Sequence, residues 1–302
     1  MKKLLSILAL LCSLVTGAQA QHNVTQDATM SEDWSVTPDN PVSAGATVTA
    51  TYSGSRHVKS VKMYITPAII NGKFTVNGDG DKVYFSKGNL QLVGERTWKF
   101  ADNQWETFGE NQSDNHRDLF GWCTVATPNK TSNNYEDYTS DNAWGDDPYL
   151  QACIGTGWHL ITGGNNGKWN YLLNSRTTTS DIRYAVGSVN GKNGLILLPD
   201  DWNAEYYALN NTNEVNGPYA DNNISLSDWI EKLEAHGAVF LPAGGYREGT
   251  VLNAVNDIGH YWCSTRGANG DVMRIDEELI LPNFFLNLYY GCSIRLVRDV
   301  AE

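Results

Sequence analysis

Five residues in the last third of the chain have the side chains that most often recognise a ligand. Tyr246 and Arg247 follow a Pro-Ala-Gly-Gly turn, and Tyr261, Trp262 and Arg266 lie in the phrase GHYWCSTRG. Tyrosine, tryptophan and arginine dominate binding hot spots because each buries a large surface and keeps a polar group. These residues therefore predict a binding surface. Because neighbouring residues of a strand face opposite sides, at least one of Tyr261 and Trp262 must point into the core.

Catalytic chemistry has weaker support in the sequence. A nucleophilic site needs a serine or cysteine beside a positioned histidine, and no G-x-S-x-G turn accompanies the six histidines. Glycoside cleavage needs two carboxylates across a sugar, and the adjacent acids at 200–201 and 276–278 are explained equally well as turns or solvated surface. We therefore predict no catalytic residue and keep an extracellular hydrolase or oxidase as the alternative.

Two histidines stand beside aromatic residues. His159 follows Trp158, and His260 precedes Tyr261. We interpret both histidines as packed side chains. His236 stands at the end of a predicted helix, where a cation interacts favourably with the helix dipole, so a capping role is the better interpretation there.

Metal binding lacks a recognisable pattern as well. The chain has neither a C-x-x-C pair nor the spaced histidines of a zinc site, and the twelve-residue EF-hand loop is absent. Asp141, Asp146 and Asp147 offer carboxylate oxygens in a polar loop, so calcium is the one metal that the sequence leaves open. No other cofactor is predicted.

The first 20 residues have the three parts of a secretory signal. Lys2 and Lys3 supply positive charge, residues 4–15 are apolar, and residues 18–20 are Ala-Gln-Ala, which fits a cleavage site. Removal of this segment predicts a secreted, periplasmic or cell-surface chain that does not insert into the membrane. The formal net charge is −12, and −14 without the two lysines, which disfavours nucleic acid as a partner and leaves a glycan or an extracellular protein.

Two helices and many short strands are predicted to position these residues. One helix ends near Arg176, and the other runs from Ser227 to His236, where Gly237 provides a stop. Spacings of three and four residues predict the buried faces, which are Trp169, Leu172 and Leu173 on the first helix and Trp229, Ile230 and Leu233 on the second. Residues 125–156 are polar and aperiodic, which predicts a long loop.

Residues 21–71 differ from the rest of the chain. A polar start precedes two alternating segments, 47–52 and 58–65, around a Ser-Gly-Ser turn at 53–55. This pattern predicts a disordered start followed by a small β-hairpin spacer. The remaining strand phrases and both helices fall within residues 72–302, which we interpret as the main domain.

The phrases of the main domain resemble those of one bacterial family in their order. They are KVYFSKGNLQ at 82–91, DLFGWCT at 118–124, NGLILLPDDW at 193–202, FLPAGGYREG at 240–249, GHYWCSTR at 259–266 and YGCSIRLVRD at 290–299. The chain resembles the Fibrobacter succinogenes major paralogous domain family of secreted Bacteroidetes-type proteins. This resemblance implies an α+β, C-type-lectin-like fold with two short helices, small antiparallel sheets and long loops, distantly akin to formylglycine-generating enzymes. It implies no particular activity, because one fold serves many functions.

The resemblance also bears on the cysteines. Four remain after removal of the signal, and an even number in an oxidising compartment favours two disulfides. The strands that carry Cys263 and Cys292 are expected to lie side by side in the resembling proteins, which implies a Cys263–Cys292 disulfide, with Cys123–Cys153 as the second bridge. Formylglycine-generating enzymes use cysteine and copper on this kind of fold, so an unbridged Cys263 would favour the redox alternative.

Overall fold

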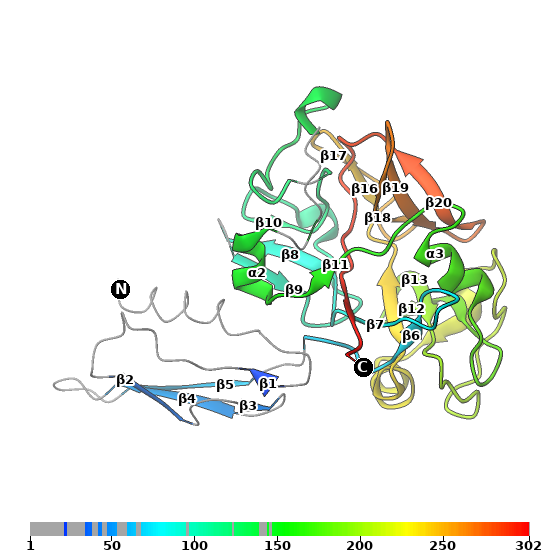
Figure 1. Ribbon diagram of the computed structural model, residues 1–302, viewed down its shortest axis with the longest axis horizontal. Coiled ribbons are helices and arrows are strands. Elements are labelled where there is room, and N and C mark those ends of the chain that lie inside the picture. The colour runs from blue at the N-terminus through cyan, green and yellow to red at the C-terminus, as the bar shows by residue number, and fades with distance from the viewer. Residues whose placement is uncertain are drawn as a thin grey trace. The chain divides into compact units, whose positions relative to one another are not determined.

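The computed structural model describes residues 68–94, 97–122, 124–138, 144 and 147–301, and before residue 68 it describes the strands β1 to β5 (Figure 1). The predicted signal segment, Cys123, Asp141 and Asp146 lie outside the described residues. The chain divides into two compact units, one with residues 1–68, 148–156 and 301, the other with residues 69–147, 157–300 and 302. Its class is mixed α+β, with few short helices and several small antiparallel sheets.

The smaller unit contains short antiparallel strands and one helix. β4 (Thr47–Tyr52) pairs with β5 (Lys59–Tyr64), so the predicted hairpin is present, and β2 (Trp34–Thr37) pairs with the other edge of β4. β1 (Gln21–His22) and β3 (Val42–Ser43) form a separate pair. The helix α2 (Pro148–Ile154) occupies part of the segment 125–156, which the sequence analysis predicted to be a loop. A proline suits the first helical position because the N–H that it lacks has no partner inside the helix.

In the larger unit, the first and last strands belong to one antiparallel sheet. Its order is β11-β21-β7-β6, made of β11 (Trp158–His159), β21 (Val297–Asp299), β7 (Lys82–Phe85) and β6 (Phe74–Thr75). A second small sheet has the order β10-β8-β9, from β10 (His116–Arg117), β8 (Leu90–Val93) and β9 (Thr97–Phe100).

A third sheet of the larger unit has the order β14-β12-β13-β15. It comprises β12 (Tyr184–Val189), β13 (Lys192–Leu197), β14 (Asn223–Ile224) and β15 (Val239–Pro242), and only the short pairing of β14 with β12 is parallel. Asn190 and Gly191 connect β12 to β13 with φ angles of 51° and 75°. Positive φ at both central positions is the requirement of a type I′ turn, whose twist matches that of the strands, and Asn-Gly is its preferred sequence.

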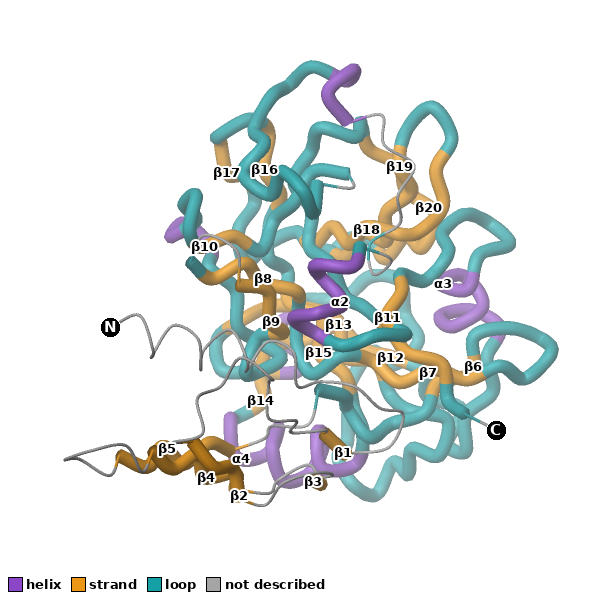
Figure 2. Tube along the Cα trace, turned by 60° about the vertical axis from the view of Figure 1, so that its left-hand side comes forward, coloured by secondary structure: helices purple, strands orange, loops and turns teal. Residues whose placement is uncertain are grey.

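The strands that carry the predicted binding residues lie next to one another in Figures 1 and 2. β18 (Gly259–Arg266), β19 (Gly270–Ile275) and β20 (Ile280–Leu286) form a three-stranded antiparallel sheet in that order. The hairpin of β16 (Tyr246–Glu248) and β17 (Val251–Asn253) joins β18 through a parallel bridge between Gly245 and Gly259.

Both predicted helices are present, and the second differs from the prediction in its start and in one residue of its buried face. The first comprises α3 (Lys168–Asn170) and η3 (Tyr171–Ser175), and it buries Trp169, Leu172 and Leu173 as predicted. The second comprises α4 (Leu226–Asp228), η5 (Trp229–Leu233) and η6 (Glu234–His236). It begins after Ser225, whose hydroxyl accepts from the Asp228 N–H at 3.1 Å, and not at Ser227.

The second difference in this helix concerns Ile230. Trp229 and Leu233 are buried, whereas Ile230 is 49% exposed and lies one turn after Leu226, which is also exposed. The buried face of this helix is therefore narrower than the face that its apolar spacing predicted. Gly237 ends the helix with a φ of 85°, and a Cβ there would lie 2.6 Å from the Cα of Gly72, so glycine is required both for the backbone angle and for the close approach. Three further helical turns are η1 (Gly109–Asn111), η2 (Tyr135–Tyr138) and η4 (Tyr219–Asn222).

A single carboxylate connects the beginning of the larger unit to its first helix. Asp200 accepts hydrogen bonds from the backbone N–H and hydroxyl of Thr75, at 3.0 and 2.7 Å, and from Lys82 at 2.9 Å and Arg176 at 3.1 Å. Burial favours the neutral acid, but the bonds from Lys82, Thr75 and Arg176 outweigh it and hold the pKa of Asp200 below its usual value. The acids at 200–201, predicted to be a turn or solvated surface, thus include one structural anion.

The main core lies between these sheets. Phe85, Trp169, Leu195, Leu241 and Tyr261 come from five different elements and are all at most 1% exposed within one cluster. Each such side chain contributes on the order of 1.5–3 kcal/mol through burial. A second cluster around Trp202, Trp229 and Phe240 packs the second helix onto the other face of β13 and β15. The sheet β18–β19–β20 therefore packs into the main core along the face that carries Tyr261.

Candidate binding surface

Three of the five predicted binding residues are buried. Arg247 is 2% exposed, Tyr261 0% and Trp262 1%. The Tyr261 hydroxyl donates to the Pro242 carbonyl at 2.7 Å, and the Trp262 indole N–H donates to the Phe120 carbonyl at 2.7 Å. The structure therefore assigns packing roles to both aromatic residues, because loop residues cover the face of β18 that was expected to be open. Trp122 packs edge-on against Trp262 with 5.3 Å between ring centroids.

Arg247 also has a structural role. Its guanidinium donates to the Gly249 carbonyl and, at 3.2 Å, to the Lys130 carbonyl. It therefore connects the β16–β17 turn to the loop that contains Lys130. Arg266 is partly exposed at the end of β18, and Tyr246 is partly exposed at the start of β16. Of the predicted set, only Tyr246 lies among other accessible aromatic rings.

The predicted Cys263–Cys292 disulfide is absent. Both cysteines are buried thiols. Tyr261 pairs with Ser293, and from this pair Cys263 lies two residues onward while Cys292 lies one residue back. Three residues of strand separate them, about 10 Å at roughly 3.3 Å per residue, beyond the Cα separation of about 7 Å that a disulfide permits. The segment that carries Cys292 lies beside β18 through the isolated bridge of Tyr261 with Ser293, but the register of that bridge prevents the disulfide. The second predicted bridge includes Cys123, which lies outside the described residues.

The unbridged Cys263 does not provide the redox site that the resemblance suggested. Its thiol is fully buried, and burial, together with the nearby Asp271 carboxylate, raises its pKa well above the ordinary value. A reactive cysteine needs an accessible thiolate in electropositive surroundings. Burial also raises the pKa of the Cys292 thiol. Both side chains fill core space as small apolar groups.

Among the described residues, a group of accessible rings lies on β16, β20 and the segment that follows β20. We define this aromatic surface by the residues Tyr246, Phe284, Phe285, Tyr289 and Tyr290. Phe285 is 61% exposed, and the other four are partly exposed. Tyr289 and Tyr290 stack at 4.9 Å, and Tyr290 lies 5.8 Å from Tyr246. Phe284 and Phe285 are successive residues of β20, which usually face opposite sides, but their rings stack at 6.0 Å and are accessible together. These contacts form two groups, Tyr246 with Tyr289 and Tyr290, and Phe284 with Phe285, and His260 joins the groups through its contacts with Tyr246 and Phe284.

His260 lies beneath this surface. Strand pairing places it opposite Arg274, and its imidazole is 5.8 Å from the Phe284 ring, with 8° between the planes, and 5.3 Å from the Tyr246 ring. The side chain is 4% exposed, and neither ring nitrogen has a hydrogen-bond partner among the described residues. Burial lowers the pKa of His260 to about 4, with a further contribution from Arg274, so the imidazole is neutral near pH 7. The interpretation of His260 as a packed residue is confirmed, and its unpartnered nitrogens are a feature that the sequence does not indicate.

Arg274 completes the polar part of this surface. Its guanidinium lies 5.4 Å from the centre of the Phe284 ring, within cation–π range. The same group forms a two-point contact with Asp276, at 2.7 Å through Nε and 2.6 Å through Nη2. Asp276 also accepts from the Glu278 N–H at 2.9 Å. The acids at 276–278 therefore include a residue that neutralises and orients a cation.

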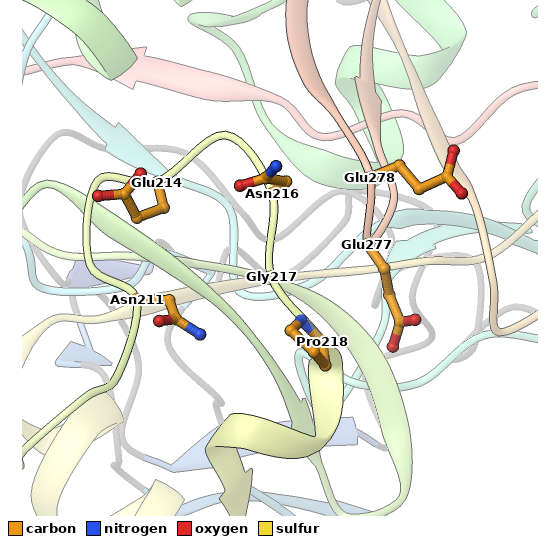
Figure 3. Close-up of a pocket in the computed structure, with 7 residues that line it drawn as sticks. All are labelled: Asn211, Glu214, Asn216, Gly217, Pro218, Glu277 and Glu278. Carbon is orange, nitrogen blue, oxygen red and sulfur yellow. The ribbon is translucent and has the colours of Figure 1, made fainter.

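A separate acidic hollow lies beside the turn between β19 and β20 (Figure 3). It has a volume of about 700 Å³ and is lined by Asn211, Glu214, Asn216, Gly217, Pro218, Glu277 and Glu278. One Glu277 oxygen accepts from the Tyr219 N–H at 2.9 Å, and the Glu277 carbonyl accepts from the Gly217 N–H at 2.8 Å. The two loops are thus fastened together. Across the part of the chain that the structure describes, no group of three His, Cys, Asp or Glu side chains is arranged to hold a metal ion.

One buried carboxyl group has a strongly raised pKa but is not part of a candidate site. Asp118 is 2% exposed and accepts from the Phe108 N–H at 2.7 Å. Burial raises the pKa of Asp118 to about 7, against the effect of that hydrogen bond. Perturbed carboxyls often mark catalytic centres, but a substrate needs access. The position of Asp118 favours a structural role.

No protein family, curated protein or solved structure matches this chain in comparisons with each. The family resemblance of its phrases therefore stays a prediction. Within the described residues, no helix has the length and apolar character needed to cross a bilayer.

Proposed function

We propose that this chain is an exported or cell-surface binding protein that recognises a glycan or protein ligand through the aromatic surface. In this proposal the larger unit is a C-type-lectin-like domain of the Fibrobacter succinogenes major paralogous type, and it has no catalytic role. The observation that carries the proposal is the exposed Phe285 ring, continued by four partly exposed rings. Rigid aromatic side chains offer large contact areas at a low cost in conformational entropy.

The electrostatics of the larger unit support binding over catalysis. The strongly perturbed acid, Asp118, is enclosed, and the cation at the surface, Arg274, is already neutralised by Asp276. The accessible acids Glu277 and Glu278 line an open hollow. A shallow aromatic face above a neutral imidazole favours a ligand that binds and dissociates without a chemical reaction.

A binding screen of the mature chain tests this proposal. Arrays of glycans and of extracellular proteins are probed with the wild type, with Phe285→Ala and with Ile230→Ala, which removes an exposed apolar side chain from the second helix. Loss of a hot-spot ring weakens binding about 30-fold, which corresponds to about 2 kcal/mol. We expect this loss for Phe285→Ala and unchanged binding for Ile230→Ala. A ligand bound equally by both variants would contradict the proposal.

A further inference from the structure

We infer that the ligand of the aromatic surface is a neutral saccharide, which stacks on the exposed rings and pairs its hydroxyl groups with the imidazole of His260. The inference rests on the proposed function and specifies the class of its ligand. Three features of the surface carry it: the stacked rings, the unpartnered imidazole and the distribution of charge.

The rings provide the stacking contact. A sugar ring presents C–H groups on its faces and hydroxyl groups around its edge, so it can lie against an aromatic ring and keep its hydroxyls free. Phe285 offers an accessible ring, and Tyr289 and Tyr290 are stacked nearly parallel, with 21° between their planes. Several rings in contact suit a ligand that has more than one sugar unit.

The imidazole provides the complementary hydrogen bonds. A neutral imidazole has one N–H donor and one nitrogen acceptor, and a hydroxyl group can serve either of them. Both His260 nitrogens are buried and unpartnered within the described chain, which is costly for polar groups. A ligand hydroxyl that reaches one of them removes this cost. A purely apolar ligand would leave the cost in place.

Access to the imidazole depends on Tyr246. Its ring lies 5.3 Å from the imidazole and is partly exposed, whereas the neighbouring Phe284 ring is parallel to the imidazole and in contact with Arg274. Partly exposed side chains change rotamer rapidly. In this inference Tyr246 turns aside as the saccharide binds, and Phe284 stays in place.

Charge favours a neutral saccharide over an anionic one. Arg274 already contacts Asp276, and Glu248 beside Tyr290 and the exposed Glu277 and Glu278 are acids. Arg266 is a cation at the end of β18, across β19 from the end of β20. The chain has a formal net charge of −12. A uronate or sulfated sugar would therefore approach a mainly negative field, in which Arg274 is already paired.

Calorimetric titration of the mature chain tests the inference. The neutral probes are cellohexaose, xylohexaose, mannohexaose and maltohexaose, and the anionic probes are a galacturonate hexasaccharide and a heparin hexasaccharide. We expect at least one neutral probe to bind and the anionic probes not to bind. Phe285→Ala and His260→Phe should each weaken the neutral complex by about tenfold or more. His260→Gln, which keeps a donor and an acceptor, should lose less than His260→Phe.

A second readout separates a direct contact from a packing effect. Addition of the neutral probe should shift the ¹⁵N resonances of His260 in the wild-type chain, and near-ultraviolet dichroism should show that both His260 variants keep the packed fold. His260→Phe preserves the ring stack on Phe284, so a loss of affinity there reports the missing nitrogens.

The possible results distinguish this inference from the proposed function. Neutral binding that needs Phe285 but tolerates His260→Phe would overturn the hydroxyl pairing alone. Binding of only anionic saccharides, or only of a protein, at Phe285 would overturn the ligand class and leave the proposed function intact. Saccharide binding that is unaffected by Phe285→Ala would overturn the inference and the proposed function together. The same conclusion follows if neither the titrations nor the arrays identify a ligand for this surface.

Discussion

The imidazole of His260 lies parallel to the phenyl ring of Phe284, with 8° between the planes and 5.8 Å between the ring centroids. The pair spans β18 and β20, with Arg274 of β19 over the same phenyl ring. This arrangement buries a titratable group beneath an accessible aromatic surface. It therefore links the stability of the fold to pH through a residue of the candidate site.

His260 should make the fold less stable in mild acid. Burial lowers its pKa to about 4, against about 6.5 for an unfolded chain, so only the unfolded state gains this proton between those values. The free energy of unfolding is therefore unaffected by this proton above pH 6.5. It falls by on the order of 3 kcal/mol as the pH decreases from 6.5 to 4. His260→Phe should remove that part of the slope. Urea unfolding of both proteins at pH 7 and 4.5 checks this, and parallel losses would contradict it.

Asp118 should have an effect in the opposite direction. Burial raises its pKa to about 7, so the folded state holds a proton that the unfolded state releases above about pH 4. The fold therefore loses stability as the pH rises from 4 through 7. Asp118→Asn keeps an oxygen that can accept from the Phe108 N–H, and should stabilise the chain at pH 8 by on the order of 2–4 kcal/mol. At pH 4 the variant and the wild type should unfold at similar urea concentrations. A gain that is equal at both pH values would refute this account.

Asp200 should be among the most costly carboxylates to remove. It receives hydrogen bonds from Thr75, Lys82 and the buried Arg176, and its loss leaves the Arg176 guanidinium without its carboxylate partner. Breaking such a pair costs about 3–5 kcal/mol. Asp200→Ala should therefore lower the unfolding free energy by about that amount. Asp201→Ala, at an exposed neighbouring position, provides the matched control and should change stability by less than about 0.5 kcal/mol.

Cys263 and Cys292 should resist alkylation in the native chain. Both thiols are buried, and burial raises the pKa of each. We expect iodoacetamide to label neither residue before unfolding, and to label both in denaturant without added reductant. Peptide mapping gives the answer directly, and a mass that links the two cysteine peptides would show that the register described for Tyr261 and Ser293 is incorrect.

Local patterns in the sequence predicted the mixed α+β class and several of its elements. The spacing of Trp169, Leu172 and Leu173 identified a buried helix face, and Gly237 marked a helix end, because both depend on neighbouring residues only. The same spacing failed at Ile230, where the width of the buried face depends on what the helix packs against. Local periodicity contains no information about that partner.

The candidate site was harder to predict because it depends on contacts between distant segments. Tyr261 and Trp262 have the composition of a hot spot, but residues of the 120–122 loop cover one of them and the main core covers the other. The offset between Cys263 and Cys292 could not be predicted either, because it is set by the pairing of Tyr261 with Ser293, which are distant in the sequence. The signal for the surface in the sequence is the aromatic run at 284–290, whereas the Tyr-Trp phrase at 259–266 marks buried residues.

The most direct test of the central claim is an aromatic ¹H–¹³C spectrum of the mature chain, recorded during titration with a neutral hexasaccharide found to bind in the calorimetric series. The account predicts that the resonances of the aromatic surface shift together, with Phe285 among the largest changes, while Trp202 and Trp229 of the second core cluster do not move. Shifts confined to residues around the acidic hollow, such as Tyr219, with Phe285 and Tyr290 unchanged, would contradict it.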